Sequence, residues 1–149
     1  VRVQRLCFVS MNKIKILLVE DEETLAMIIQ DTLSQEGLDV CIANDGLEGL
    51  NMVAQMTPDV IVADIMMPKM DGFEMVRRIR RLNIKTPVLF LTARSAVKDV
   101  VEGFEIGGDE FICRGTEKKF FSIRRTYSWL LTVLIYILKV SALAIFLTP

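Results

Sequence analysis

Five short apolar segments alternate with four segments of helical periodicity, and this alternation limits the possible folds more than any other feature. The first apolar segment, residues 14–19, is rich in β-branched and leucine side chains and lacks polar alternation, as expected for a strand buried on both faces. Helical spacing follows over residues 22–36, and Gly37 is a typical helix stop. We predict further strands at 38–43, 60–63, 87–91 and 110–113, and further helices at 46–56, 72–82 and 97–106.

Strands that alternate with helices pair in parallel through right-handed crossovers, with helices on both faces of the sheet. The pattern therefore predicts an α/β fold, a doubly wound five-stranded parallel sheet. In such sheets functional groups gather at the carboxyl ends of the strands, near the point where the strand order reverses.

Polar residues stand where three of the predicted strands end. Glu20 and Asp21 follow the first strand, Asp64 follows the third, and Thr92 follows the fourth. Converging carboxylates repel one another unless a cation lies among them, and oxygen ligands favour a hard ion such as Mg²⁺. A carboxylate can also attack phosphorus, so the pattern indicates a magnesium-dependent phosphoryl site. The alternative is that these acids only cap helices or solvate loops.

The chain contains no histidine, which excludes histidine phosphotransfer proteins, histidine-metal enzymes and histidine-based hydrolases. Residues 1–113 carry 12 basic and 18 acidic side chains, which argues against direct binding of nucleic acid. Three widely spaced cysteines are typical of unpaired thiols in a reducing cytoplasm.

Three segments together resemble the receiver domain of bacterial two-component response regulators, which has a flavodoxin-like fold. They are residues 17–22 (LLVEDE), 64–73 (DIMMPKMDGF) and 91–94 (LTAR), and the resemblance covers residues 12–113. Met66, Arg94 and the loop after Asp64 look most like the winged-helix (OmpR-like) subclass.

The resemblance implies a phosphorelay switch rather than an enzyme, with at most self-catalysed phosphotransfer and dephosphorylation. Asp64 would form an aspartyl phosphate by accepting a phosphoryl group from a sensor histidine kinase. Asp21, Asp64 and the Met66 backbone carbonyl would bind Mg²⁺, with Glu20 acting through water. Thr92 would hydrogen-bond a phosphoryl oxygen, and Phe111 would be the aromatic switch residue, whose ring turns inward on activation.

The family places a lysine before a cis proline after the fifth strand, and this chain departs from that pattern. Counting 22 residues from Thr92 gives Arg114, which precedes a glycine, whereas matching by motif gives Lys119, displaced by five residues and also without proline. A cis bond before a residue other than proline costs about 3–4 kcal/mol, so we do not expect the usual loop. We therefore predict impaired phosphorylation or uncoupled signalling, and the alternative function is a non-switching scaffold with the receiver shape.

The C-terminal part has a different composition, so we expect an atypical last helix and a truncated or altered C-terminus. We divide the chain into an N-terminal extension (1–11), a receiver core (12–113), an altered basic linker (114–126) and an apolar helical tail (127–149). Residues 127–148 contain a single charge, and as a helix they would be about 33 Å long.

This tail is either a packed or accidental sequence, or an anchor in the inner membrane that leaves the receiver in the cytoplasm. We expect a cytoplasmic protein without its own DNA-binding output domain, and the sequence leaves dimerisation undecided. Residues 107–111 spell GGDEF, the signature of diguanylate cyclases, but they stand where receivers have a similar loop before the fifth strand.

Overall fold

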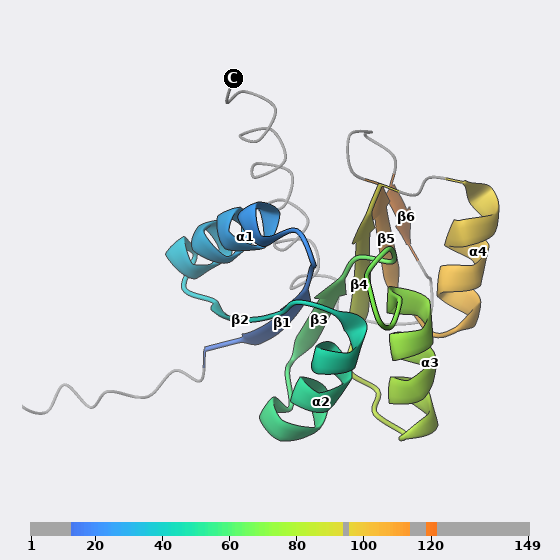
Figure 1. Ribbon diagram of the computed structural model, residues 1–149, viewed down its shortest axis with the longest axis horizontal. Helices are drawn as coiled ribbons and strands as arrows, with labels where there is room; N and C mark the ends of the chain where they lie inside the picture. The colour runs from blue at the N-terminus through green and yellow to red at the C-terminus, as the bar shows by residue number, and fades with distance from the viewer. Residues whose placement is uncertain (1–12, 94–95, 114–118, 122–149) are drawn as a thin grey trace, which may run out of the picture.

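The computed structural model describes residues 13–93, 96–113 and 119–121 (Figure 1). The proposed extension 1–11, Arg94, Arg114 and the apolar tail lie outside these residues. The described residues form one six-stranded sheet with the strand order β2-β1-β3-β4-β5-β6. In chain order its elements are β1 (Lys15–Val19), α1 (Glu23–Gln35), β2 (Asp39–Ala43), α2 (Gly46–Met56), β3 (Val60–Ala63), α3 (Gly72–Arg81), β4 (Val88–Thr92), α4 (Val97–Glu105), β5 (Glu110–Cys113) and β6 (Lys119–Phe121).

The first five strands pair in parallel, which confirms the predicted doubly wound sheet. Strand order reverses at β1, which pairs with β2 on one side and with β3 on the other. The loops after β1 and β3 therefore leave the sheet side by side, at the position where ligands bind in this class of fold.

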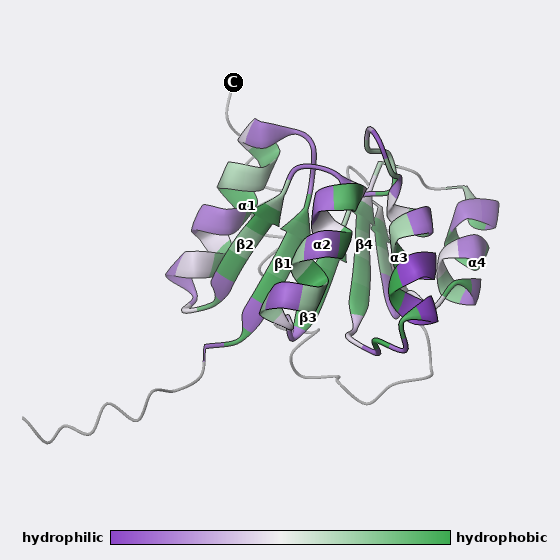
Figure 2. Ribbon diagram, turned by 60° about the horizontal axis from the view of Figure 1, so that its bottom comes forward, coloured by the Kyte–Doolittle hydropathy of each residue, from purple (hydrophilic) through white to green (hydrophobic). Residues whose placement is uncertain are grey.

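Two hydrophobic layers cover the two faces of the sheet, and this explains the continuous apolar strands. In β1, Leu17 and Val19 belong to one layer, and Ile16 and Leu18 belong to the other. The first layer packs under α2, α3 and α4, and the second packs under α1. Figure 2 shows the hydrophobic sides of these helices turned toward the sheet. A strand that is buried on both sides has no solvent-facing position for a polar residue.

Strand β6 was not predicted, and it lies inside the segment 114–126 that we interpreted as a basic linker. It runs antiparallel to β5, with Phe111 opposite Phe120 and Ile112 opposite Lys119. An open edge strand presents unpaired backbone groups, and β6 satisfies those of β5. Three residues are too few to give a recognisable strand pattern, so only the pairing reveals this element.

The GGDEF sequence forms the turn between α4 and β5 and the start of β5 itself. Gly107 has a φ of +104°, which a residue with a side chain rarely adopts. These residues therefore form the turn and the start of the fifth strand, which is where we expected the loop before that strand.

Among the residues that the structure describes, no helix is long and apolar enough to cross a bilayer. The segment 127–148, for which an anchor was considered, lies outside them.

Candidate functional site

The site lies at the carboxyl ends of β1, β3 and β4, where backbone pairing continues for one residue beyond the strands. The Glu20 N–H donates to the carbonyl of Ala43, and the Asp64 N–H donates to the carbonyl of Val19, each at 3.0 Å. These bonds fix the backbone of two acidic residues at the same sheet edge.

Glu20, Asp21 and Asp64 form an acidic cluster, as predicted from their places at strand ends. One carboxylate oxygen from each lies within 4.8 Å of the others. Glu20 and Asp64 are only 2% and 5% exposed, whereas Asp21 is exposed. Three carboxylates at this spacing, two of them buried, form a donor set of the kind that binds a hard divalent cation. The residues present therefore fit Mg²⁺.

The Asp64 side chain is oriented by the backbone that follows it. Its Oδ1 accepts the N–H of Ile65 at 2.7 Å and lies 3.4 Å from the N–H of Met66. Gly72 passes so close that a Cβ there would lie 2.2 Å from the Asp64 carbonyl oxygen. A glycine is therefore required where α3 begins, because the backbone of this residue packs directly against that of the acidic residue.

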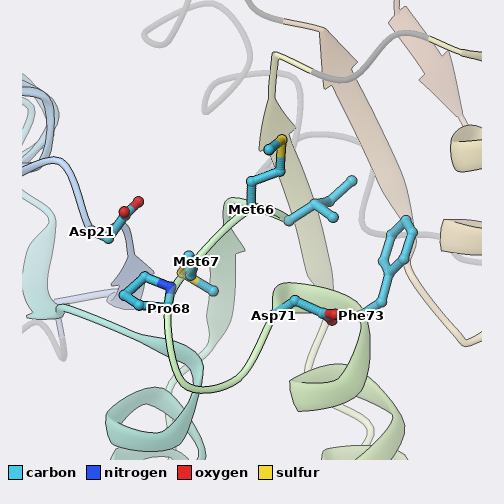
Figure 3. Close-up of a pocket in the computed structure, with 7 residues that line it drawn as sticks. Asp21, Met66, Met67, Pro68, Asp71 and Phe73 are labelled. Atoms are coloured by element: carbon cyan, nitrogen blue, oxygen red, sulfur yellow. The ribbon is translucent and has the colours of Figure 1, made fainter.

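An open pocket of about 410 Å³ lies beside the cluster, over the loop between β3 and α3. Figure 3 shows Asp21 on one side of this loop, with Asp71 and Phe73 on the other. The pocket is lined by Asp21, Ile65, Met66, Met67, Pro68, Asp71 and Phe73. Asp21 thus belongs both to the acidic cluster and to the lining of a pocket that opens to solvent.

Thr92 and Phe111 occupy the neighbouring strands. Ala63 pairs with Phe90, so Asp64 and Thr92 follow that pair by one and two residues and leave the sheet at the same edge. Thr92 and Phe111 are both fully buried. The Phe111 ring lies 5.9 Å from Phe90, whose ring packs edge-on against Phe73 at 5.3 Å. An aromatic row therefore extends from the predicted switch residue to the pocket.

The two candidates for the missing family lysine have different outcomes. Arg114 lies outside the described residues. Lys119 lies on β6, opposite Ile112 of β5.

An ion pair that the sequence did not predict lies beside the site. Asp45 caps α2 by accepting the Glu48 N–H at 2.8 Å, and it also accepts a hydrogen bond from Lys69 Nζ at 2.8 Å. That hydrogen bond from Lys69 lowers the pKa of Asp45 and raises the pKa of Lys69. The capping role could have been found, because an acidic residue followed three positions later by glutamate is a helix-start signal. The partner, 24 residues away, leaves no such signal.

Comparisons with known proteins agree with this geometry. The response regulator receiver domain family matches residues 16–120. Over 103 residues the chain is 44% identical to the transcriptional regulatory protein TrcR of Mycobacterium tuberculosis, covering 69% of this chain and 40% of that protein. It is 41% identical over 104 residues to the alkaline phosphatase synthesis transcriptional regulatory protein PhoP of Bacillus subtilis, covering 70% and 43%. The chain thus spans less than half the length of these two relatives.

Solved receiver structures share the fold. The receiver domain of the Francisella response regulator 1452 superposes with a TM-score of 0.68 at 31% identity, covering 85% of this chain and 98% of that chain. The chemotaxis protein CheY4 of Vibrio cholerae superposes with a TM-score of 0.67 at 29% identity, covering 84% and 98%. With the acidic cluster at the expected sheet edge, these matches show that the chain belongs to the response regulator receiver domain family, with transcriptional response regulators among its relatives.

Proposed function

We propose that this receiver is a phosphorylation switch whose phosphoacceptor is Asp64 and whose phosphoryl donor is a sensor histidine kinase. The observation that carries the proposal is the acidic cluster, in which the buried Asp64 lies with Glu20 and Asp21 beside an open pocket. A carboxylate that is held in place by backbone N–H groups is a positioned nucleophile. Transcriptional activity is not part of the proposal, because the chain spans less than half the length of the two transcriptional regulators compared above.

In the proposed reaction, an oxygen of the Asp64 carboxylate attacks the phosphorus of a phosphohistidine. A P–O bond forms, the P–N bond breaks, and the imidazole leaves with the bonding electron pair. The Thr92 hydroxyl donates a hydrogen bond to a phosphoryl oxygen, and Phe111 responds as the switch residue. Asp21, Asp64 and the Met66 carbonyl would hold Mg²⁺, with Glu20 acting through water, and the ion would neutralise charge on the transferring group.

We propose Arg114 rather than Lys119 as the cation that replaces the family lysine. Asp64 lies at the level of Leu91, Ile112 and Lys119 in successive strands. Three strand spacings of about 4.8 Å separate the Lys119 backbone from Asp64 by about 14 Å. Arg114 directly follows β5, which is one strand closer. Its planar guanidinium differs from a compact ammonium, so we expect slower phosphorylation than in receivers with the lysine.

The experiment is phosphoryl transfer from acetyl phosphate or phosphoramidate with Mg²⁺, followed by intact mass spectrometry. Wild type is expected to gain one phosphoryl group, and Asp64→Ala is expected to gain none. Arg114→Ala should slow the gain, and Lys119→Ala should leave it unchanged. A folded wild type that gains no phosphate, or an equal gain in Asp64→Ala, would contradict the proposal.

The non-switching scaffold is not favoured, because the chain retains the acidic cluster and the buried Thr92. We place the switch in the cytoplasm, with attachment to the inner membrane through residues 127–148 as the alternative. Cell fractionation separates the two, because an anchored receiver would sediment with the membranes.

A further inference from the structure

The loop between β3 and α3 is firmly attached at both ends. At its start, Asp64 pairs with the Val19 carbonyl and orients Ile65 through its carboxylate. At its end, the Gly72 N–H returns to the Ile65 carbonyl at 2.9 Å. The loop is thereby closed on itself at Ile65, and its ends cannot move without disturbing the acidic cluster.

The middle of the loop is more exposed, although the Met70 N–H donates to the Pro68 carbonyl at 2.7 Å and Met70 is buried in the core. Met66 is 59% exposed, and Pro68 is also exposed. The Met66 N–H contact with Asp64 is long, at 3.4 Å. The Met66 carbonyl, which the proposed function assigns to Mg²⁺, thus lies on the span between the fixed Ile65 and the tip of the loop.

The tip of the loop, residues 68–70, is also held from outside the loop, by the first turn of α2. Lys69 reaches across to Asp45, whose side chain is only 8% exposed although that of Lys69 is 67% exposed. The backbones of α2 and of the loop also approach each other closely, since a Cβ on Gly46 would lie 2.3 Å from the Met70 carbonyl oxygen.

Lys69 holds an unusual backbone conformation at this point. Its φ is +63°, in the left-handed region that residues with a side chain seldom adopt. The ion pair provides a reason for a lysine at a position that would otherwise favour glycine or asparagine.

We infer that the ion pair between Asp45 and Lys69 is a positioning device, which holds the tip of the β3–α3 loop and so fixes the position of the Met66 carbonyl, the group that would bind Mg²⁺ in the proposed function. The inference rests on the proposed function of the Asp64 site. An ion pair whose lysine is 67% exposed contributes only modestly to overall stability, so the larger effect is expected in metal affinity.

Charge alone predicts a different result from positioning. Removing a lysine ammonium near the site would strengthen Mg²⁺ binding, because like charges repel, and removing the Asp45 carboxylate would weaken it. Loss of a positioning contact weakens binding in both variants. The sign of the effect at Lys69 therefore distinguishes the two explanations.

The experiment is isothermal titration of the full chain with Mg²⁺ alone. Lys69→Met keeps the length of the side chain and removes the charge, and Asp45→Asn removes the charge while keeping a residue that caps helices well. Mutation of residues that contact metal ligands typically changes metal affinity by roughly 10–100-fold. Because the ion pair between Asp45 and Lys69 contacts no proposed ligand directly, we expect a smaller loss of Mg²⁺ affinity, about three- to tenfold in each variant. The double variant should lose no more than either single variant, since the two residues act as one unit. Lys69→Arg should restore most of the affinity.

Arg78→Met is the matched control, because it breaks an ion pair of the same 2.8 Å length, with Glu74, within helix α3. Its Mg²⁺ affinity should equal that of wild type. If Lys69→Met binds Mg²⁺ as tightly as wild type, or more tightly, while Asp64→Ala does not bind, the inference is overturned and the proposed function stands. If Asp64→Ala binds Mg²⁺ like wild type, the proposed metal site is wrong and the inference fails with it.

Discussion

Replacing Arg80 by methionine is expected to lower the free energy of unfolding by about 2–4 kcal/mol. The Arg80 guanidinium donates to the carbonyl of Gly107 at 2.7 Å and to those of Ile84 and Thr86 at 2.9 Å. It also pairs with Asp109 at 3.4 Å. This one side chain thus ties the end of α3 to the segment before β4 and to the turn before β5.

The magnitude follows from the three short bonds. Hydrogen bonds to a charged donor contribute about 1.5–3 kcal/mol each. Because the Arg80 side chain is 21% exposed, water can replace part of the hydrogen bonding that the carbonyl groups lose in the variant. About 1 kcal/mol for each carbonyl gives a loss near 3 kcal/mol, and methionine retains much of the packing of the aliphatic stem. For a domain of about 100 residues, this corresponds to a fall in Tm of roughly 8–16 °C.

Urea unfolding followed by far-UV circular dichroism measures this loss. The matched control is Arg81→Met, which removes a charge from an exposed neighbouring position and should change stability by less than about 0.5 kcal/mol. If the two variants lose the same free energy, the hydrogen bonds of Arg80 do not stabilise the domain, and the reasoning from geometry is refuted.

Further perturbations test the site and its surroundings. Gly72→Ala should weaken Mg²⁺ binding at least about tenfold, because its Cβ would lie 2.2 Å from the Asp64 carbonyl oxygen and displace it; unchanged affinity by calorimetry would contradict this. Gly46→Ala should destabilise the protein by about 1–3 kcal/mol in urea unfolding, since its Cβ would lie 2.3 Å from the Met70 carbonyl oxygen; a more stable variant would show that helix propensity dominates instead. A hydrogen bond from a lysine ammonium lowers the pKa of Asp45 below its ordinary value of 3.8, so the stability that ionised Asp45 contributes is complete above that value and is lost as the pH falls below it. The difference in free energy of unfolding between wild type and Asp45→Asn, measured by urea unfolding, should therefore shrink on acidification. A difference that grows as the pH falls would contradict the lowered pKa of Asp45.

Much of the fold could be read from local patterns, because burial on two faces and helical periodicity both repeat over a few residues. The strand at residues 60–63 and the helix at 46–56 were predicted with the bounds that the structure shows. Glu20, Asp21, Asp64 and Thr92 could be gathered at one edge for a related reason. The carboxyl ends of parallel strands meet at the same side of a sheet, so place in the sequence nearly fixes place in space.

Contacts between distant segments could not be read in this way. Lys69 meets Asp45 across 24 residues, and Arg80 meets Gly107 across 27. The pairing of β6 with β5 likewise depends on where the chain turns back, which no periodicity encodes. The sequence by itself determined the parallel sheet and the identity of the acidic residues at its edge. Only the tertiary structure decided which side chain fixes the loop that follows Asp64, because that choice depends on how α2 packs beside the loop.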